Sequence, residues 1–291
     1  MRAGFVTIVG RPNVGKSTLL NRLVGQKVAI VTEKPQTTRN RILAIANTPG
    51  AQLVFFDTPG IHKPKHEMNR RMVDLAIRSL KNVDLGLLLV DVTESFGGGD
   101  EFVLDRVREA KVPVILALNK VDRVRKPEIL PLIDDYRKRH EFVDIVPISA
   151  RNGENVDALV SVLEDNLPEG EPLYPPETLT DLPERFFVSE IVREKILETT
   201  RQEIPYSTAV VIDLWEEGEK LTRIEASILV ERDSQKGIVV GKGGSMLKGI
   251  GTAARQDIEA FLGTRVFLGL HVRVRSEWRE NQRLLSELGI E

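Results

Sequence analysis

Short apolar runs alternate with longer amphipathic stretches over the first 167 residues of the chain. These runs have the length and composition typical of β-strands, and they cover residues 5–9, 53–56, 85–90, 114–118 and 145–146. Helical patterns lie between most of them. Because strands that are buried on both faces read as continuous apolar runs, the pattern predicts an α/β domain with a mostly parallel sheet and helices on both faces.

A proline-rich segment follows this region. Five of the 15 prolines fall within residues 168–183, which we interpret as a domain linker. The chain of 291 residues is also long enough for about two domains of ordinary size. We therefore expect a first domain at residues 1–168, a linker at 169–186 and a second domain at 187–291.

The hydrophobic pattern changes after the linker. Apolar residues recur as on one face of a helix at Val188, Ile191, Val192 and Ile196, and again at Leu247, Ile250, Ala254, Ile258 and Phe261. Strict alternation over residues 224–230 and 266–274 indicates half-buried strands, and the run at 209–214 forms an antiparallel hairpin with the first of them. The order helix, strand, strand, short helix, helix, strand predicts a smaller α+β domain.

Composition and charge exclude several classes of protein. The chain is 41% hydrophobic and 29% charged, which is typical of globular proteins, and its longest apolar runs are far shorter than a membrane span. The first residues show no signal-like apolar core, so we expect a cytoplasmic protein. With a net charge of −2, any affinity for nucleic acid must come from a local basic patch.

The scarcity of sulfur and histidine excludes much metal and nucleophile chemistry. There is no cysteine, which rules out disulfides, thiolate nucleophiles, iron–sulfur clusters and thiolate zinc sites. His62 and His66 have the spacing of two metal ligands on one helix face, but Pro64 between them indicates a loop and argues against chelation.

A glycine-rich motif lies between the first predicted strand and a predicted helix. It consists of Gly10, Arg11, Pro12, Asn13, Val14, Gly15, Lys16 and Ser17, with Thr18 next. In this context G-x-x-x-x-G-K-S is typical of a P-loop, whose backbone N–H groups surround the α- and β-phosphates of a nucleotide. We expect Lys16 to reach the β- and γ-phosphates and the Ser17 hydroxyl to ligate Mg²⁺. A plain glycine turn would not require Lys and Ser here.

A second motif closes the run at residues 53–56. It consists of Asp57, Thr58, Pro59 and Gly60. A carboxylate at this strand end can hold Mg²⁺ through water, and the Gly60 N–H can meet a γ-phosphate. By itself the motif is only a turn signature.

Two further motifs at strand ends favour guanine. They are Asn119, Lys120, Val121 and Asp122, and then Ser149, Ala150 and Arg151. The Asp122 carboxylate can accept both the ring N1–H and the exocyclic amino group, a donor pair that adenine lacks. We expect Asn119 to tie the loops together and the Ala150 N–H to donate to O6. Because ligands bind open α/β sheets at the carboxyl edge, the order of these motifs predicts a site for GTP or GDP.

The combination resembles the GTPases of the translation-factor-related class. Residues 35–39, Pro-Gln-Thr-Thr-Arg, look like their switch I segment, with Thr38 at the position whose hydroxyl joins Mg²⁺ and senses the γ-phosphate. Without the other motifs this segment would read as a polar surface loop. The candidate metal ligands are therefore Ser17, Thr38 and Asp57, and the candidate catalytic residues are Lys16, Thr38, Gly60 and Asn13.

One position departs from Ras-like enzymes. Ile61 stands where those proteins carry the glutamine that orients the attacking water, so we expect slow intrinsic hydrolysis or another electrostatic element. Asn13 matches the asparagine that helps to hold K⁺ near the phosphates in some GTPases that lack this glutamine. The alternative for Asn13 is a neutral side chain that faces solvent.

A second glycine loop lies in the C-terminal domain. Gly241, Lys242, Gly243 and Gly244 fit the G-x-x-G loop of a KH domain, which clamps a nucleic-acid backbone. No acidic residue occurs between Asp233 and Asp257, whereas Lys236, Lys242, Lys248 and Arg255 all fall there. We predict an RNA site of these glycines and basic residues, with bases in an aliphatic groove around Ile238 and Val240. The alternative is a flexible turn beside a solvated helix.

A P-loop GTPase followed by a helix-first KH domain resembles the Era family over essentially the whole chain. The shared stretches include Pro35-Gln-Thr-Thr-Arg39, Asp57-Thr-Pro-Gly-Ile-His62, Glu190-Ile-Val-Arg-Glu-Lys-Ile196 and the loop Gly241-Lys-Gly-Gly244. The resemblance implies a type II KH fold, binding near the 3′ end of small-subunit ribosomal RNA and a GTP-switched role in small-subunit maturation. It also implies peripheral association with the membrane, although the chain has no lipidation motif or basic amphipathic helix. We expect a monomer.

Two other functions share parts of this pattern. A metabolic P-loop kinase would carry residues 10–17 but has no need of Asp122, so a preference for GTP over ATP excludes it. A signalling switch whose C-terminal domain binds protein would pass that test. Salt-dependent RNA binding by residues 187–291 would exclude it.

Overall fold

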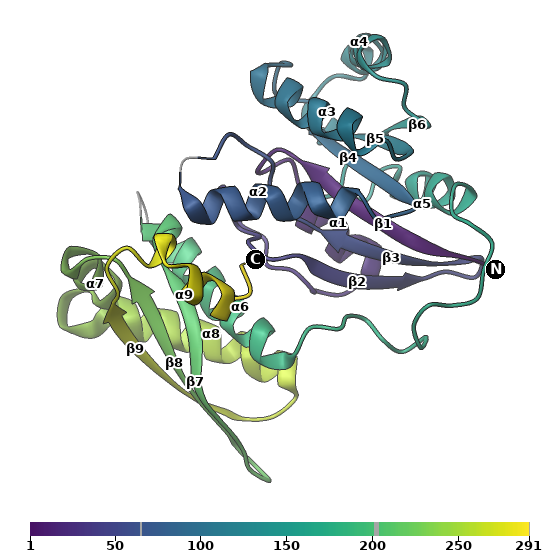
Figure 1. Cartoon of the computed structure of the whole chain (residues 1–291). Coiled ribbons are helices and arrows are strands. Elements are labelled where there is room, and N and C mark those ends of the chain that lie inside the picture. Colours follow the sequence, from purple (N-terminus) through teal and green to yellow (C-terminus); the bar gives the residue numbers. More distant parts are fainter. Residues whose placement is uncertain (65, 201–203, 291) are drawn as a thin grey trace.

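The first sheet carries the N-terminal half of the chain. The computed structural model describes residues 1–64, 66–200 and 204–290. Within these ranges the sheet has six strands in the order β2-β3-β1-β4-β5-β6 (Figure 1). They are β1 (Arg2–Gly10), β2 (Ile42–Asn47), β3 (Ala51–Asp57), β4 (Leu85–Asp91), β5 (Val114–Asn119) and β6 (Asp144–Ile148). Strand β2 is antiparallel to β3, and the other neighbours are parallel, which confirms the prediction of a mostly parallel sheet.

Helices cover both faces of this sheet. They are α1 (Lys16–Val24), α2 (Glu67–Leu80), α3 (Gly98–Ala110), α4 (Ile129–Arg139) and α5 (Val156–Asp165). In β4, Leu87 and Leu89 share a core with residues of α1 and α5, whereas Leu88 and Val90 share a core with residues of α2 and α3. Successive side chains therefore enter different cores, which is why the strand is apolar at nearly every position.

Strand β2 was not among the predicted strands. Its run Ile-Leu-Ala-Ile-Ala shows no polar alternation, because both faces of the strand are buried, one by the core and one partly by the linker. The outer edge of the strand is paired as well. The Ile45 N–H donates to the Leu179 oxygen at 2.9 Å, and the Thr180 hydroxyl donates to the Leu43 oxygen at 2.6 Å. The proline-rich segment thus lies along the edge strand and shields it from pairing with other chains.

The second sheet lies in the C-terminal part. Helix α6 (Glu184–Thr199) is followed by β7 (Ala209–Glu217), β8 (Thr222–Val230), α7 (Asp233–Val240), α8 (Ser245–Leu262) and β9 (Val266–Val274). Strands β7 and β8 are antiparallel, and β8 and β9 are parallel. This is the predicted order of elements, and the α+β fold is confirmed. Helix α6 begins inside the segment predicted as linker, and the domain boundaries at 168 and 187 stay predictions.

A short C-terminal helix, α9 (Gln282–Glu287), was not predicted. Its Leu285 belongs to an apolar cluster that joins the two parts of the molecule. Met68 and Met72 of α2 are buried there against Trp278 and Leu285. The two sheets are therefore connected by apolar packing as well as by the linker. Among the described residues, no helix combines the length and apolar character needed to cross a bilayer.

Candidate nucleotide-binding and RNA-binding sites

A cavity of about 640 Å³ lies at the carboxyl edge of the six-stranded sheet. All the predicted loop motifs contribute to its lining, through Pro12, Asn13, Gly15, Lys16, Ser17, Thr18, Thr38, Gly60, Asn119, Lys120, Asp122, Ala150 and Arg151. The remaining predicted residues of the nucleotide site do not line it: Gly10, Arg11, Val14, Asp57, Thr58, Pro59, Ile61, Val121 and Ser149. Five chain segments far apart in sequence thus meet at one place.

Asn119 ties two of these loops together. Its side-chain amide donates to the Val14 oxygen at 2.7 Å, and its oxygen accepts from the Ala150 N–H at 2.8 Å. Gly15 makes this approach possible, because a Cβ at this position would stand 2.4 Å from the Asn119 nitrogen and its φ of 101° is unfavourable for other residues. The Ala150 N–H, which we expected to reach guanine O6, is used by Asn119 here.

Lys16 is a buried cation in the P-loop. Its ammonium group donates to the Arg11 oxygen at 3.0 Å and to the Gly10 oxygen at 3.4 Å. Burial lowers the pKa of Lys16 to about 8, although the Asp57 carboxylate opposes this shift. An anionic phosphate beside the ammonium would favour its charged form, so the site is electrostatically prepared for a polyphosphate.

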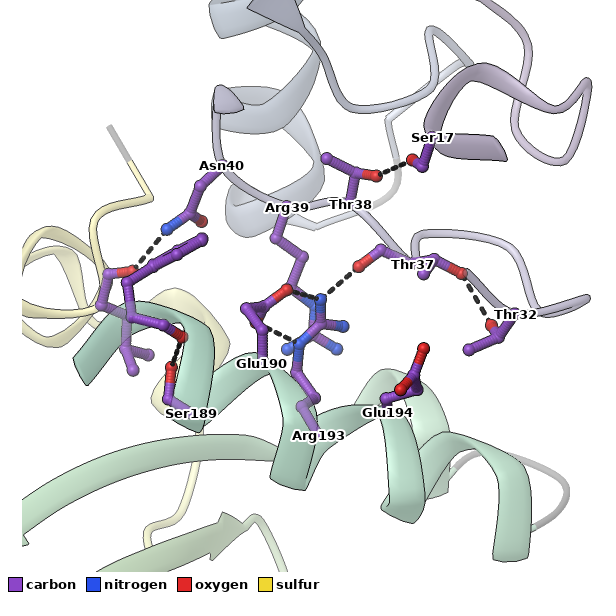
Figure 2. A network of polar contacts seen from close by, with 12 residues as sticks. Ser17, Thr32, Thr37, Thr38, Arg39, Asn40, Ser189, Glu190, Arg193 and Glu194 are labelled. Atoms are coloured by element: carbon purple, nitrogen blue, oxygen red, sulfur yellow. Dashed lines mark hydrogen bonds and ion pairs between the residues drawn. The ribbon is translucent and has the colours of Figure 1, made fainter. Parts of the chain in front are cut away.

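Three oxygen-bearing side chains meet behind the P-loop. The Ser17 hydroxyl donates to Asp57 Oδ2 at 2.6 Å. It also lies 2.8 Å from the Thr38 hydroxyl (Figure 2). Asp57 is fully buried, and its Oδ1 has no hydrogen-bond partner. Burial raises the pKa of Asp57, against the opposing effects of Lys16, Ser17 and Thr38.

These residues fit Mg²⁺ bound together with a nucleotide. Hydroxyl and carboxylate oxygens are the ligands that Mg²⁺ prefers, and an unpartnered carboxylate oxygen is available to it or to one of its waters. In the part of the chain that the structure describes, no three His, Asp or Glu side chains form a metal cluster. The nucleotide phosphates would therefore complete the coordination shell, as is usual for Mg²⁺.

The structure places the Ile61 side chain in the core and the Asn13 side chain at the cavity. The Ile61 side chain is fully buried in the core that contains residues of α2 and α3, so only its backbone, whose N–H donates to the Gly10 oxygen, adjoins the P-loop. Its predicted place among the nucleotide contacts is therefore not supported for the side chain. Asn13 lines the cavity, and its amide donates to the Glu33 oxygen at 2.8 Å. It thus bridges the P-loop and the loop that leads to residues 35–39.

Sequence reasoning missed three acidic residues that line the cavity, Glu33, Asp91 and Glu94. Asp91, at the end of β4, lines it together with Thr93 and Glu94, and its carboxylate pairs with the Lys120 ammonium. Burial works to raise the pKa of Asp91, but hydrogen bonds from Lys120 and Thr93 outweigh it and leave the pKa below its usual value. Asp91 orients the Lys120 side chain. Its position at the end of a predicted strand was the signal that could have identified it.

The second glycine loop is exposed at the junction of α7 and α8. Lys242 and Gly243 are open to solvent, and Gly243 has a φ of 59° with nothing near its Cβ position. Of the predicted RNA-binding residues, Gly244, Lys248 and Arg255 line a groove of about 380 Å³, and Lys236, Gly241, Lys242 and Gly243 lie outside it.

The apolar wall of this groove differs from the prediction. Leu247, Leu268 and Leu270 form it, instead of Ile238 and Val240. Val240 packs against the domain core, whereas β9, which carries Leu268 and Leu270, is an edge strand whose side is open to a ligand. A flexible single strand could lie between the basic residues of α8 and this edge.

Known protein families match both parts of the chain. Residues 5–120 match the family model described as 50S ribosome-binding GTPase, and residues 203–279 match the KH domain. The chain is 52% identical over 290 residues to GTPase Era of Geobacter metallireducens, covering 99% of this chain and 97% of that protein.

Two solved structures are similar over the whole chain. A variant of Era from Aquifex aeolicus bound to GDP and AlF4⁻ is 44% identical with a TM-score of 0.96, and covers 100% of this chain and 99% of its own. A structure of Era in complex with MgGDPNP and nucleotides 1506–1542 of 16S ribosomal RNA is 44% identical with a TM-score of 0.97 and the same coverage. With this identity over both domains, the chain belongs to the Era family of GTPases.

Proposed function

We propose that this GTPase binds near the 3′ end of small-subunit ribosomal RNA through its KH domain and acts in the biogenesis of the small (30S) ribosomal subunit. The observation that carries the proposal is the presence, in one chain, of a guanine-type nucleotide cavity and an exposed Gly-Lys-Gly-Gly loop beside a basic groove. The similar Era structure that holds a GTP analogue and a 16S RNA fragment supports it.

The residues of the cavity bind different parts of GTP. Lys16 and the P-loop N–H groups bind the phosphates, and Asp122 selects guanine. Ser17, Thr38 and Asp57 would hold Mg²⁺, which neutralises charge that develops on the phosphates. Gly60, whose Cβ position is only 2.6 Å from the Pro12 nitrogen, lies close enough to the P-loop for its N–H to meet the γ-phosphate.

Hydrolysis by the free protein is proposed to be slow. Ile61 offers no group that could orient the attacking water, and its side chain is buried away from the cavity. With Asn13 Nδ2 engaged by the Glu33 oxygen, Asn13 Oδ1 remains to help bind a monovalent cation, and we propose K⁺ in this role. Activation would otherwise have to come from a bound partner.

Hydrolysis and RNA binding measured together test the proposal. The full-length protein should bind a fragment of the 3′ end of 16S rRNA with an affinity that falls steeply with salt, and the fragment should raise its GTP hydrolysis rate. A scrambled RNA of the same length is the control. If neither RNA binds while GTP is hydrolysed, the protein is a switch whose C-terminal domain binds protein.

The proposal also includes the state and location of the molecule. We propose a cytoplasmic monomer that associates peripherally with the cytoplasmic face of the membrane. Sedimentation at several protein concentrations tests the monomer, and cell fractionation with and without high salt tests the location. Protein that stays in the soluble fraction at low salt would contradict the membrane contact.

A further inference from the structure

Residues 27–39 lie against helix α6 of the KH domain (Figure 2). This stretch is the switch segment, and the predicted switch I residues 35–39 form its end. Four of its groups bond to this helix: the Lys27 and Lys34 ammoniums, the Val31 N–H and the Thr37 oxygen. The contacts join residues more than 150 positions apart in sequence. The part of the GTP site that responds to the γ-phosphate is thus supported from the other domain.

Glu194 holds the beginning of this segment. Its carboxylate accepts from Lys27 Nζ at 2.6 Å and from the Val31 N–H at 3.2 Å. The Glu194 side chain is only 4% exposed, whereas that of Lys27 is 50% exposed. A buried carboxylate is stable only where donors face it, so its two oxygens fix where the segment starts.

Arg193 holds the end of the segment. Its guanidinium donates to both oxygens of Glu190, at 2.7 and 2.5 Å, and its Nη2 also donates to the Thr37 oxygen. Thr37 directly precedes Thr38, whose hydroxyl lies 2.8 Å from the Ser17 hydroxyl. One peptide unit therefore separates a buried arginine of the KH domain from a candidate Mg²⁺ ligand.

The C-terminus of α6 adds a third contact. The Lys34 ammonium donates to the oxygens of Leu197 and Thr200, in the last turn of the helix and at its cap. Carbonyls at a helix end lack partners within the helix, and the helix dipole favours a cation there. Lys34 thus ties the middle of the switch segment to the same rigid element.

We propose that Arg193 and Glu194 are positioning residues of the GTP site. Helix α6 of the KH domain holds the segment around Thr38 in place, so that the Thr38 hydroxyl meets the metal and the γ-phosphate. The inference rests on the GTP-binding part of the proposed function and does not depend on RNA. GDP has no γ-phosphate, so GDP affinity should not depend on this support.

Two isosteric or conservative variants and a matched control test the role in the full-length protein. Arg193→Lys keeps the charge that balances Glu190, but its compact ammonium lacks the planar fork that binds both Glu190 oxygens while Nη2 also reaches the Thr37 oxygen. Glu194→Gln removes the charge that pairs with Lys27. Arg71→Met is the control, because Arg71 of α2 donates to the Ile290 oxygen at 3.2 Å and joins the same two domains without contacting the switch segment.

We expect a selective effect on the GTP state, measured without RNA. Each positioning variant should lower kcat about tenfold, as the loss of one charge-assisted hydrogen bond allows, and raise the Mg²⁺ concentration for half-maximal rate. The affinity for MgGDPNP should fall relative to that for GDP. Arg71→Met should retain the wild-type kcat and Mg²⁺ dependence, and thermal melting should show that every variant is folded.

If Arg193→Lys or Glu194→Gln does not fold, Lys27→Met serves as a further variant. The Lys27 side chain is half exposed, so its loss removes one contact without opening the core. The proposal is overturned if the folded positioning variants hydrolyse GTP as fast as wild type or faster, or if Arg71→Met is equally affected. If wild type hydrolyses no GTP, the proposed function fails, and the ratio of MgGDPNP to GDP affinity still decides this inference.

Discussion

The nucleotide site and the RNA loop differ in how their polar groups are held. At the nucleotide site Lys16, Asn119 and Asp57 are buried, and bonds between loops fix their side chains. At the RNA loop Lys242 and Gly243 are exposed on a turn between two helices. The first site is organised before its ligand arrives, whereas the second leaves its cation in water.

This difference teaches what each site can discriminate. Asp122 is exposed in the cavity, and a bound base would cover it. An acceptor that a base covers without offering a donor costs much free energy, so the site can reject a wrong base strongly. An exposed lysine beside a glycine turn attracts any phosphate backbone, and salt screens that attraction. We therefore expect sharp specificity for guanine and a strong salt dependence for RNA.

The largest expected effect is at Asp122. Asp122→Asn should lower the affinity for GTP by about 10⁴-fold, because the amide cannot accept both guanine donors, and should favour xanthosine triphosphate, whose O2 suits an amide donor. Competition binding of the two nucleotides measures this. Asp134→Asn, an exposed carboxylate on α4, is the control. Unchanged GTP affinity in Asp122→Asn would remove Asp122 from the base site.

Replacement of Ile61 tests whether its side chain belongs to the core or to the cavity. Ile61→Gln should destabilise the protein by about 3 kcal/mol, because a polar amide would be buried among apolar residues of the α2 and α3 core. Urea unfolding measures the loss, with Ile61→Val as the apolar control. Ile61→Gln should not accelerate GTP hydrolysis. Faster hydrolysis at unchanged stability would show that this side chain reaches the nucleotide.

A smaller effect is expected at Asn13. GTP hydrolysis should be several-fold faster in KCl than in NaCl at equal ionic strength, and Asn13→Ala should abolish the difference while GDP binding is spared. Initial rates in the two salts measure it, and Asn47→Ala, an amide that bonds to the Pro176 oxygen far from the motif, is the control. Equal wild-type rates in both salts would contradict a role for K⁺.

Local patterns were sufficient for the parts of the molecule that depend on local chemistry. The P-loop could be predicted because Gly15, Lys16 and Ser17 follow an apolar strand directly, and the role of Asn119 in joining loops agrees with its two bonds. The elements of the KH domain followed from alternation and helical spacing for the same reason.

The parts that were missed depend on partners distant in sequence. Strand β2 was not predicted because its edge is paired with the linker at Leu179. The sequence around Arg39 does not indicate that its guanidinium donates to the oxygens of Pro205 and Thr208. Burial and the neighbouring Arg193 lower the pKa of Arg39, whereas Glu190 raises it. Buried charges such as Glu194 read as ordinary surface residues on α6 until the facing segment is known.

The central claim is that the exposed glycine loop binds RNA in a protein whose other domain binds GTP. Lys242→Asp combined with Gly243→Asp replaces a cation by two carboxylates and places a side chain at a φ of 59°. Lys220→Asp, at the exposed turn between β7 and β8, is the matched control. Circular dichroism and thermal melting test whether both variants are folded.

Titration of a 16S rRNA 3′ fragment at several salt concentrations tests this claim most directly. Wild type and the Lys220→Asp control should bind tightly at low salt with a steep salt slope, and the double variant should bind at least about tenfold more weakly at every salt concentration. If the folded double variant binds the fragment as tightly as wild type, the loop is only a turn and the RNA site lies elsewhere.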